Sequence, residues 1–236
     1  MEVINASLVS GKKVILRYDI DVALHPLEDF KLKAGLNTLK LCLDNAAQVI
    51  LIGHVGRPGG KVVSELSVEP IRRWFEAQVQ SNKLRILENL RFDPREEAED
   101  SGYAQELADM GDIYVNEAFS SYRPAVSTTV LPSLLPHGAG LRFAEEVRVL
   151  TAVRENPKKP FVVIMGGAKV EDKLPVIAVL ARNADAVLIG GKLVAEIREE
   201  NIQLPKNVLV GKLNEDGFDI APETVDAWKD LIFKAA

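Results

Sequence analysis

The sequence predicts an α/β protein of two Rossmann-like, parallel-sheet domains joined by a helix and a hinge, with the second domain truncated. Short apolar runs rich in valine, isoleucine and leucine alternate along the chain with stretches of helical period. This alternation is typical of right-handed βαβ crossovers in a mostly parallel sheet. It is interrupted at residues 156–160 (NPKKP), where two prolines stiffen the backbone. We therefore place a hinge there and expect domains at residues 1–156 and 157–236.

Four apolar runs in the first half predict buried strands with helices between them. The strands are expected at residues 13–17, 49–52, 84–87 and 113–115, and the helices at 32–45, 68–80, 103–109 and 140–155. Pro70 suits the first turn of the second helix, because a missing N–H costs nothing there. The last helix joins the two halves, and we expect its Leu141, Val147, Leu150 and Val153 to face inward.

The second half repeats the alternation more briefly. Residues 162–164, 187–189 and 208–210 predict three buried strands, and residues 176–180 and 223–233 predict helices. Three strands are few for a doubly wound sheet that must cover both of its faces. We therefore expect an incomplete second domain.

Composition and charge exclude several classes of function. The 236 residues carry a net charge of −5, which argues against a nucleic-acid-binding surface. No window reaches the roughly 18 apolar residues of a membrane span. The single cysteine, Cys42, lies in an apolar run, which predicts a buried thiol and no internal disulfide. We expect a cytoplasmic monomer with no nucleic-acid or membrane partner.

Charged side chains follow several predicted strands of the first half. They are Asp19, His54, Arg57, Arg91 and Arg123. Because the carboxyl ends of parallel strands meet at one edge of a sheet, we expect these side chains to converge there. The planar fork of arginine suits phosphate and carboxylate oxygens, so a shared anion pocket is predicted. The alternative is a set of solvated surface charges.

Residues 161–173 (FVVIMGGAKVEDK) combine a predicted strand with two glycines and two lysines. Gly166 and Gly167 allow the backbone to approach a ligand, and a helix after them would direct free N–H groups to the same place. Lys169 and Lys173, four residues apart on one helical face, would repel each other unless an anion lay between them. A tight turn with two solvated lysines is the alternative.

Two common nucleotide-binding motifs are absent. Residues 56–61 have one residue too few between glycines for a phosphate loop, and Val62 stands where a serine or threonine would bind magnesium. Residues 138–140 (GAG) lack the third glycine of a dinucleotide fingerprint and follow proline and histidine rather than a strand. The sequence also has no cluster of cysteines and histidines that would predict a metal site.

The first half carries cationic side chains, and the second half carries a loop of glycines and lysines. This combination suits phosphoryl transfer, which depends on positioning and charge neutralisation.

Six segments resemble, in order, the motifs of the phosphoglycerate kinase family. They are residues 17–21 (RYDID), 53–58 (GHVGRP), 87–92 (LENLRF), 114–119 (YVNEAF), 160–173 (PFVVIMGGAKVEDK) and 218–224 (FDIAPET). The resemblance implies a first domain that binds 3-phosphoglycerate and a second that binds ATP or ADP with Mg2+. It implies reversible phosphoryl transfer between 1,3-bisphosphoglycerate with ADP and 3-phosphoglycerate with ATP, in glycolysis. No general base is needed, because the acceptor carboxylate is ionised at pH 7.

The same resemblance implies roles for individual residues. Phosphoglycerate would be held by Asp19, Asp21, Lys31, His54, Arg57, Arg91 and Arg123. The nucleotide phosphates would meet Gly166, Gly167, Lys169, Lys173, Gly190 and Gly191. Arg57, Lys169 and Lys173 would act on the transferred group, and Mg2+ would arrive on the nucleotide without a metal site in the chain.

The chain also departs from the family pattern. Asp21 stands where the family has asparagine, Lys31 where it has arginine, and Lys192 where it has the third glycine of a GGG turn. Residues 120–128 lack two histidines that the family has. The family's WNGP and GGGD segments and its last helix are not found. Three interpretations stay open: a phosphoglycerate kinase whose sequence is incomplete here, a degenerate relative that binds anionic metabolites without catalysis, and an unrelated dinucleotide-dependent enzyme. We expect no turnover from the 236 residues alone.

Overall fold

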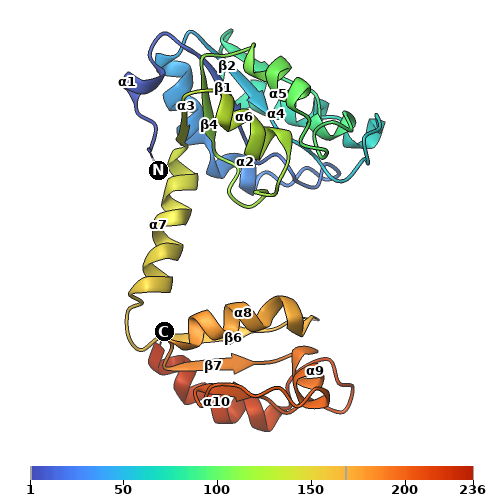
Figure 1. Ribbon diagram of the computed structural model, residues 1–236, viewed down its shortest axis with the longest axis vertical. Helices are drawn as coiled ribbons and strands as arrows, with labels where there is room; N and C mark the ends of the chain where they lie inside the picture. Colours follow the sequence, from blue (N-terminus) through green and yellow to red (C-terminus); the bar gives the residue numbers. More distant parts are fainter. Residues whose placement is uncertain (1, 168, 236) are drawn as a thin grey trace. The chain divides into compact units, whose positions relative to one another are not determined.

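The computed structural model describes residues 2–167 and 169–235 and forms two compact units, Met1–Val147 and Arg148–Ala236. Each unit has a parallel sheet with helices on its two faces (Figure 1). The chain passes from one unit to the other within the helix α7 (Leu141–Glu155). This division precedes the proline segment, so the boundary at residues 156/157 stays a prediction.

The first unit has a five-stranded sheet in the order β3-β2-β1-β4-β5. Its strands are β1 (Lys13–Arg17), β2 (Gln48–Ile52), β3 (Leu84–Ile86), β4 (Ile113–Asn116) and β5 (His137–Ala139), all parallel to their neighbours. The first four were predicted within one residue at each end. The fifth strand, which contains Gly138, was not predicted, because β5 is too short to leave an apolar pattern. The strand order reverses beside β1, where ligands of such sheets bind.

Helices cover both faces of this sheet. They are α1 (Ala6–Val9), α2 (Phe30–Ala34), α3 (Leu36–Asn45), α4 (Glu69–Gln78), α5 (Ser101–Ala108), α6 (Leu131–Leu134) and the first turns of α7, with the short turns η1 (Ser64–Leu66), η2 (Leu90–Phe92) and η3 (Val126–Val130). One apolar core lies on the side of α3 and α4, and another on the side of α5 and α6. Cys42 of α3 is buried as predicted, and burial raises the pKa of its thiol to about 12.

The single helix predicted at residues 32–45 is two helices, because the chain breaks at Gly35. The Tyr18 hydroxyl donates to the Leu32 carbonyl at 2.5 Å, an acceptor that a continuous helix would offer to the amide of Leu36. The Tyr18 ring also lies so close that a Cβ on Gly35 would be 2.5 Å from Tyr18 Cζ. A contact with Tyr18, which directly follows β1, therefore sets the break.

The inward face predicted for α7 is wrong. None of its residues is buried, and Leu150 is 50% exposed. At about 100° per residue, the four residues that we expected to face inward spread over more than half of the helix circumference. They cannot line one buried stripe.

The second unit has a three-stranded parallel sheet in the order β6-β7-β8. Its strands are β6 (Val162–Met165), β7 (Ala186–Ile189) and β8 (Val208–Val210), and its helices are α8 (Val170–Ala181), α9 (Leu193–Glu199) and α10 (Pro222–Ala235). Val170 of α8 and Leu193 of α9 belong to the core on one face, and Trp228 of α10 belongs to the core on the other. The predicted strands and the two predicted helices are present, whereas α9 was missed.

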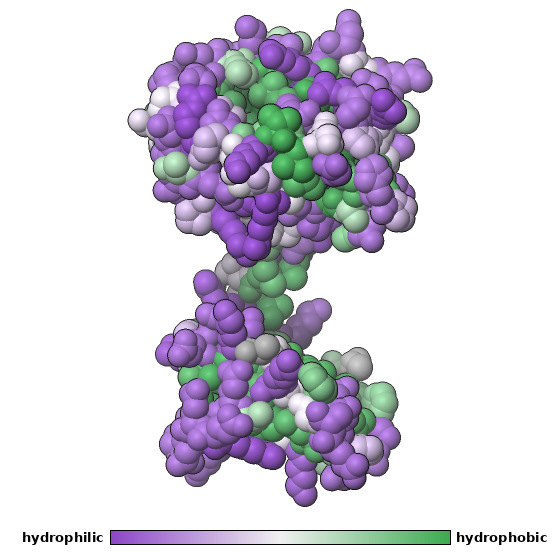
Figure 2. Space-filling model, turned by 90° about the vertical axis from the view of Figure 1, so that its right-hand side faces the viewer, coloured by the Kyte–Doolittle hydropathy of each residue, from purple (hydrophilic) through white to green (hydrophobic). Residues whose placement is uncertain are grey.

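The prediction that β6 is buried on both faces is wrong. Among the described strands β6 is at the edge of its sheet, and Ile164 is 67% exposed. Val163 and Met165 pack into the core on the side of α8 and α9, whereas Ile164 on the opposite face of the strand is exposed. Figure 2 shows hydrophilic side chains over much of the visible surface of each unit, with smaller hydrophobic areas between them. Among the described helices, none combines the length and apolar character needed to cross a bilayer.

Candidate functional site

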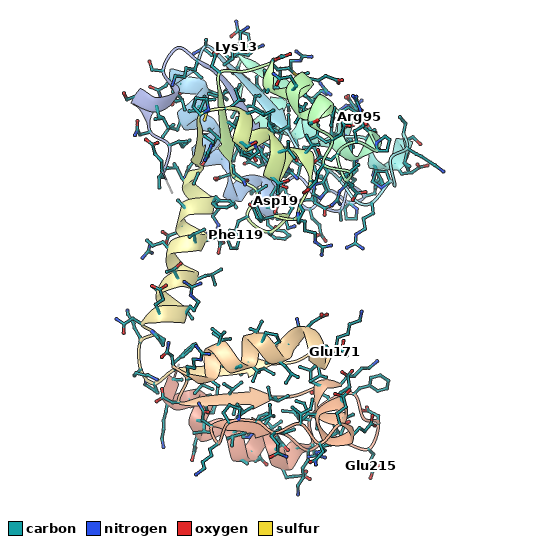
Figure 3. The ribbon with its side chains drawn as sticks, viewed as in Figure 1. Lys13, Asp19, Arg95, Phe119, Glu171 and Glu215 are labelled. Carbon is teal, nitrogen blue, oxygen red and sulfur yellow. The ribbon has the colours of Figure 1, made fainter. Side chains whose placement is uncertain are left out.

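A small cavity of about 110 Å³ lies beyond the carboxyl ends of the strands in the first unit. Figure 3 shows Lys13, where β1 begins, at one end of the sheet, and Asp19 and Phe119 toward the other. The cavity, called the anion pocket below, is lined by Asp21, Lys31, His54, Arg57, Arg91, Ser120, Ser121 and Arg123. The structure therefore brings together every predicted phosphoglycerate-binding residue except Asp19, which lies directly behind the lining.

Asp19 and Lys31 organise one wall of the anion pocket. The Ser120 hydroxyl donates to Asp19 Oδ2, and Lys31 Nζ lies 3.7 Å from the same carboxylate oxygen. Lys31 Nζ also donates to the Asp21 carbonyl oxygen at 3.1 Å. Asp19 thus positions a serine and a lysine of the pocket, and it also lines a neighbouring cavity of about 230 Å³.

Asp21 is the single acidic side chain in the lining of this cavity. Its Oδ2 lies 3.7 Å from His54 Nε2, and its Oδ1 accepts from the Gly56 amide at 2.8 Å. His54 and the Gly56 amide hold the pKa of Asp21 well below its ordinary value. Asp21 is therefore ionised at neutral pH and opposes part of the positive charge around it.

The lining has four basic side chains, of which Arg91 is the most firmly held. Arg91 Nη1 donates to the Gly56 carbonyl at 2.8 Å, and its Nε lies 3.2 Å from Glu97 Oε1. Arg57 and Arg123 are exposed, and among the described residues neither side chain has a hydrogen-bond or ion-pair partner. Two guanidinium groups thus stay available to an anion, beside one whose place is fixed.

Arg17 is a residue of this region that sequence reasoning missed. It ends β1 and is 1% exposed, and its Nη2 lies 2.7 Å from His54 Nδ1. Burial lowers the pKa of His54 and the charge of Arg17 adds to this, against the opposite effect of Asp21. An arginine that closes an otherwise apolar strand, KVILR, is the signal that would have indicated it.

In the second unit, two glycine turns lie side by side at the carboxyl ends of β6 and β7. A Cβ on Gly166 would lie 3.7 Å from the Gly190 carbonyl oxygen, and one on Gly191 would lie 3.9 Å from the Gly167 nitrogen. Gly167 and Gly191 have φ angles of +139° and +63°, which other residues rarely adopt. The two turns expose backbone without side chains, as a phosphate-binding surface requires.

The two lysines of this region do not share a helical face, which corrects the prediction. Lys169 precedes α8 with an extended backbone (φ −142°, ψ 107°), so only Lys173 is helical. A Cβ on Gly167 would lie 3.5 Å from Lys173 Cε, so this side chain lies beside the first glycine turn. Ala168, between Gly167 and Lys169, lies outside the described residues.

The first amide of α8 is not free, contrary to the prediction. The Val170 N–H donates to Glu196 Oε2 of α9 at 2.8 Å. A phosphate at this helix end would compete with the Glu196 carboxylate. Nothing in the local sequence of α9 indicates this contact. Within residues 2–167 and 169–235, no group of three or more His, Cys, Asp or Glu side chains is arranged to hold a metal ion.

Comparisons with known proteins give one consistent result. The family model described as phosphoglycerate kinase matches residues 4–83 and 73–230. The phosphoglycerate kinase of Roseiflexus sp. (strain RS-1) is 37% identical over 256 residues, which cover 96% of this chain and 62% of that protein. The phosphoglycerate kinase of Moorella thermoacetica is 36% identical over 209 residues, which cover 78% of this chain and 53% of that protein.

Solved structures share the fold. The phosphoglycerate kinase of Coxiella burnetii matches with a TM-score of 0.73 at 24% identity, covering 96% of this chain and 61% of that chain. The enzyme of Pyrococcus horikoshii OT3 matches with a TM-score of 0.74 at 21% identity, covering 96% of this chain and 77% of that chain. The present chain spans 53% to 62% of the two curated relatives described above.

Proposed function

Because the chain belongs to the phosphoglycerate kinase family, we propose that it binds 3-phosphoglycerate and an adenine nucleotide for reversible phosphoryl transfer between them. The family and the two-domain α/β fold are its premises. The substrates and the residues that hold them are the content of the proposal. We expect the protein to act in glycolysis as a cytoplasmic monomer.

The observation that carries the proposal is the anion pocket. Its lining brings four basic side chains and one acidic one to a cavity of about 110 Å³. That volume is about the volume that three or four water molecules occupy in the liquid, at about 30 Å³ each. A cavity of this size suits a phosphate or carboxylate group. Arg57 and Arg123 have side chains available to pair with such a group, and guanidinium groups bind its oxygens in pairs.

The nucleotide phosphates are expected at the two glycine turns of the second unit. Gly166, Gly167, Gly190 and Gly191 leave room that a Cβ would occupy, and Lys173 lies beside them. Lys169 is exposed next to the same turn. Magnesium would arrive on the nucleotide and neutralise phosphate charge. The Val170 amide can join the site when a phosphate displaces Glu196.

The proposed phosphoryl transfer depends on positioning of the substrates rather than on proton transfer. The acceptor is a carboxylate, which is ionised at neutral pH and needs no general base. Arg57, Lys169 and Lys173 would supply positive charge to the transferred group, which is the main source of catalysis in phosphoryl transfer. The alternative of a relative that binds anions without catalysis has no support in the comparisons, since the relatives described above are phosphoglycerate kinases.

Calorimetric titration of 3-phosphoglycerate into the full chain tests the first half of the proposal. Arg57→Ala and Arg123→Ala should each weaken binding at least tenfold, because each removes a charge-assisted hydrogen bond worth about 1.5–3 kcal/mol. Neither side chain has a hydrogen-bond or ion-pair partner in the described chain, so neither variant should lose stability. Arg73→Ala on α4, which removes an exposed arginine outside the pocket, is the matched control. Equal affinity in all four proteins would refute the pocket.

Titration of MgATP tests the second half. Lys173→Ala should weaken nucleotide binding, while Lys229→Ala on α10, an exposed lysine paired with Asp226, should leave it unchanged. A coupled assay of 1,3-bisphosphoglycerate formation then measures turnover. Binding of neither substrate would contradict the proposal as a whole.

A further inference from the structure

A chain of buried polar side chains leads from the anion pocket into the interior of the first unit. It runs from His54 through Arg17 and Ser127 to Glu96, and none of the four is more than 5% exposed. Of these four only His54 lines the pocket. The other three are placed to act on a ligand only through His54.

Glu96 and Ser127 form the inner end of this chain. Glu96 Oε1 accepts from the Ser127 hydroxyl at 2.5 Å, and Oε2 accepts from the Ser127 amide at 3.1 Å. A hydroxyl has one proton to donate, so the Ser127 oxygen keeps its lone pairs for another donor. Arg17 Nε donates to that oxygen at 3.0 Å. Glu96 therefore sets the direction of the hydrogen bonds at Ser127.

Arg17 links Ser127 to His54 by hydrogen bonds. Its Nη1 donates to the Tyr18 carbonyl at 2.6 Å, and its Nη2 lies 2.7 Å from His54 Nδ1. A guanidinium group has donors only, so His54 Nδ1 is the acceptor of this bond. The ring proton of the neutral imidazole is then on Nε2, which lies 3.7 Å from Asp21 Oδ2 beside the pocket.

Protonation of His54 at Nδ1 would break this bond and bring two cations into contact. The charged groups that face the ring are Arg17 on β1, Asp21 after β1, and Arg91 on η2. Burial and the two arginines lower the pKa of His54, and Asp21 acts in the opposite direction. The surroundings thus favour a neutral imidazole with one donor toward the pocket.

We propose that Glu96 and Ser127 are positioning residues, which act through Arg17 to keep His54 accepting at Nδ1 and donating from Nε2 into the anion pocket. The value of this donor to a ligand depends on the proposed function. The state of His54 itself is a property of the free protein and can be measured without a ligand.

Long-range proton–nitrogen NMR spectra of the imidazoles in the full chain, recorded from pH 5 to pH 8, test the proposal. His25 and His137 are both exposed and serve as internal references. In the wild type, neutral His54 should carry its proton on Nε2 alone, and its pKa should lie below the ordinary value of a histidine. A wild-type His54 that carries its proton on Nδ1, or that is cationic at pH 7, would overturn the proposal.

Variants of Ser127 and Glu96 distinguish a positioning role of these residues from a purely structural one. In Ser127→Ala, Arg17 loses the acceptor of its Nε and should move away from His54. The Nδ1–H form of His54 should then appear, its titration should move to higher pH, and 3-phosphoglycerate binding should weaken about tenfold. Glu96→Gln should also produce the Nδ1–H form, whereas Ser127→Thr keeps the hydroxyl and should restore the wild-type spectrum. If Ser127→Ala does not fold, Ser127→Cys is measured in the same way.

The outcomes distinguish this proposal from the proposed function. Folded variants with a wild-type His54 spectrum, or with wild-type affinity for 3-phosphoglycerate, would overturn the positioning role. A wild-type protein that does not bind 3-phosphoglycerate would contradict the proposed function, yet the spectra of His54 would still test the hydrogen-bond chain.

Discussion

Glu117 should make the stability of the first unit fall as the pH rises from about 4.5 to about 7. Its carboxylate is buried at the start of α7, where Oε1 accepts from the Thr38 hydroxyl at 2.8 Å and from the Arg142 amide at 3.1 Å. Oε2 accepts from the Phe143 amide at 3.3 Å. Burial nevertheless raises the pKa of Glu117 to about 7, from an ordinary value of 4.5.

This difference in pKa fixes the sign and size of the effect. Between the two pKa values the folded protein holds a proton that the unfolded chain has released, so stability decreases with rising pH. About 2.5 pH units, at 1.36 kcal/mol each, give about 3 kcal/mol between pH 4.5 and pH 7. The full stabilisation is present below pH 4.5 and is lost once the folded protein releases the proton.

Glu117→Gln isolates this effect, because its amide does not titrate. At pH 5 the variant should be less stable by about 1 kcal/mol, since its NH2 group would face the Phe143 amide and one hydrogen bond would be lost. At pH 8 it should be more stable than the wild type by about 2 kcal/mol. The difference between the two proteins cancels the titration of other groups, such as His54.

Urea unfolding at pH 5, 6, 7 and 8 measures this difference. Trp74 belongs to the first unit and Trp228 to the second, so Trp228→Phe in both proteins restricts the fluorescence signal to the first unit. Glu146→Gln, on α7 and paired with Arg142, is the control for loss of a nearby charge. A variant that is less stable than the wild type by the same amount at pH 5 and pH 8 would refute the reasoning.

Three further predictions concern single residues. Asp21→Asn should tighten 3-phosphoglycerate binding about threefold at low salt, where charge is least screened, and weaker or unchanged binding in calorimetry would contradict this. Gly35→Ala should destabilise the first unit by about 1–3 kcal/mol in urea, because its Cβ would meet the Tyr18 ring at 2.5 Å; an unchanged midpoint would show that the ring can move. The buried thiol of Cys42, whose pKa is raised to about 12, should react with a disulfide reagent only at the rate of unfolding, and rapid reaction of the native protein would disprove its burial.

The sequence predicts best what depends on neighbours along the chain. The central strands leave apolar runs, and His54, Arg57 and Arg91 follow such strands directly, so their position at one edge of the sheet could be inferred. The break at Gly35 could not be inferred, because it depends on the Tyr18 ring, which lies 17 residues earlier in the chain.

The same limit applies to both candidate sites. Arg17 ends a predicted strand, but its burial depends on Ser127, which lies 110 residues further along the chain. The amide of Val170 is occupied by Glu196, which lies 26 residues away on another helix. Such contacts depend on how distant segments pack together, and no local pattern of residue types predicts them.

Gly56 is held from both sides by oppositely charged residues. Its N–H donates to the Asp21 carboxylate at 2.8 Å, and its carbonyl accepts from Arg91 at 2.8 Å. The backbone next to Arg57 is therefore fixed during folding, before any anion arrives. A ligand that binds Arg57 then has to immobilise its side chain, at about 0.5–1.5 kcal/mol, without ordering the backbone before it. Association should then proceed without a slow conformational step, and its rate should rise in proportion to ligand concentration and fall with added salt.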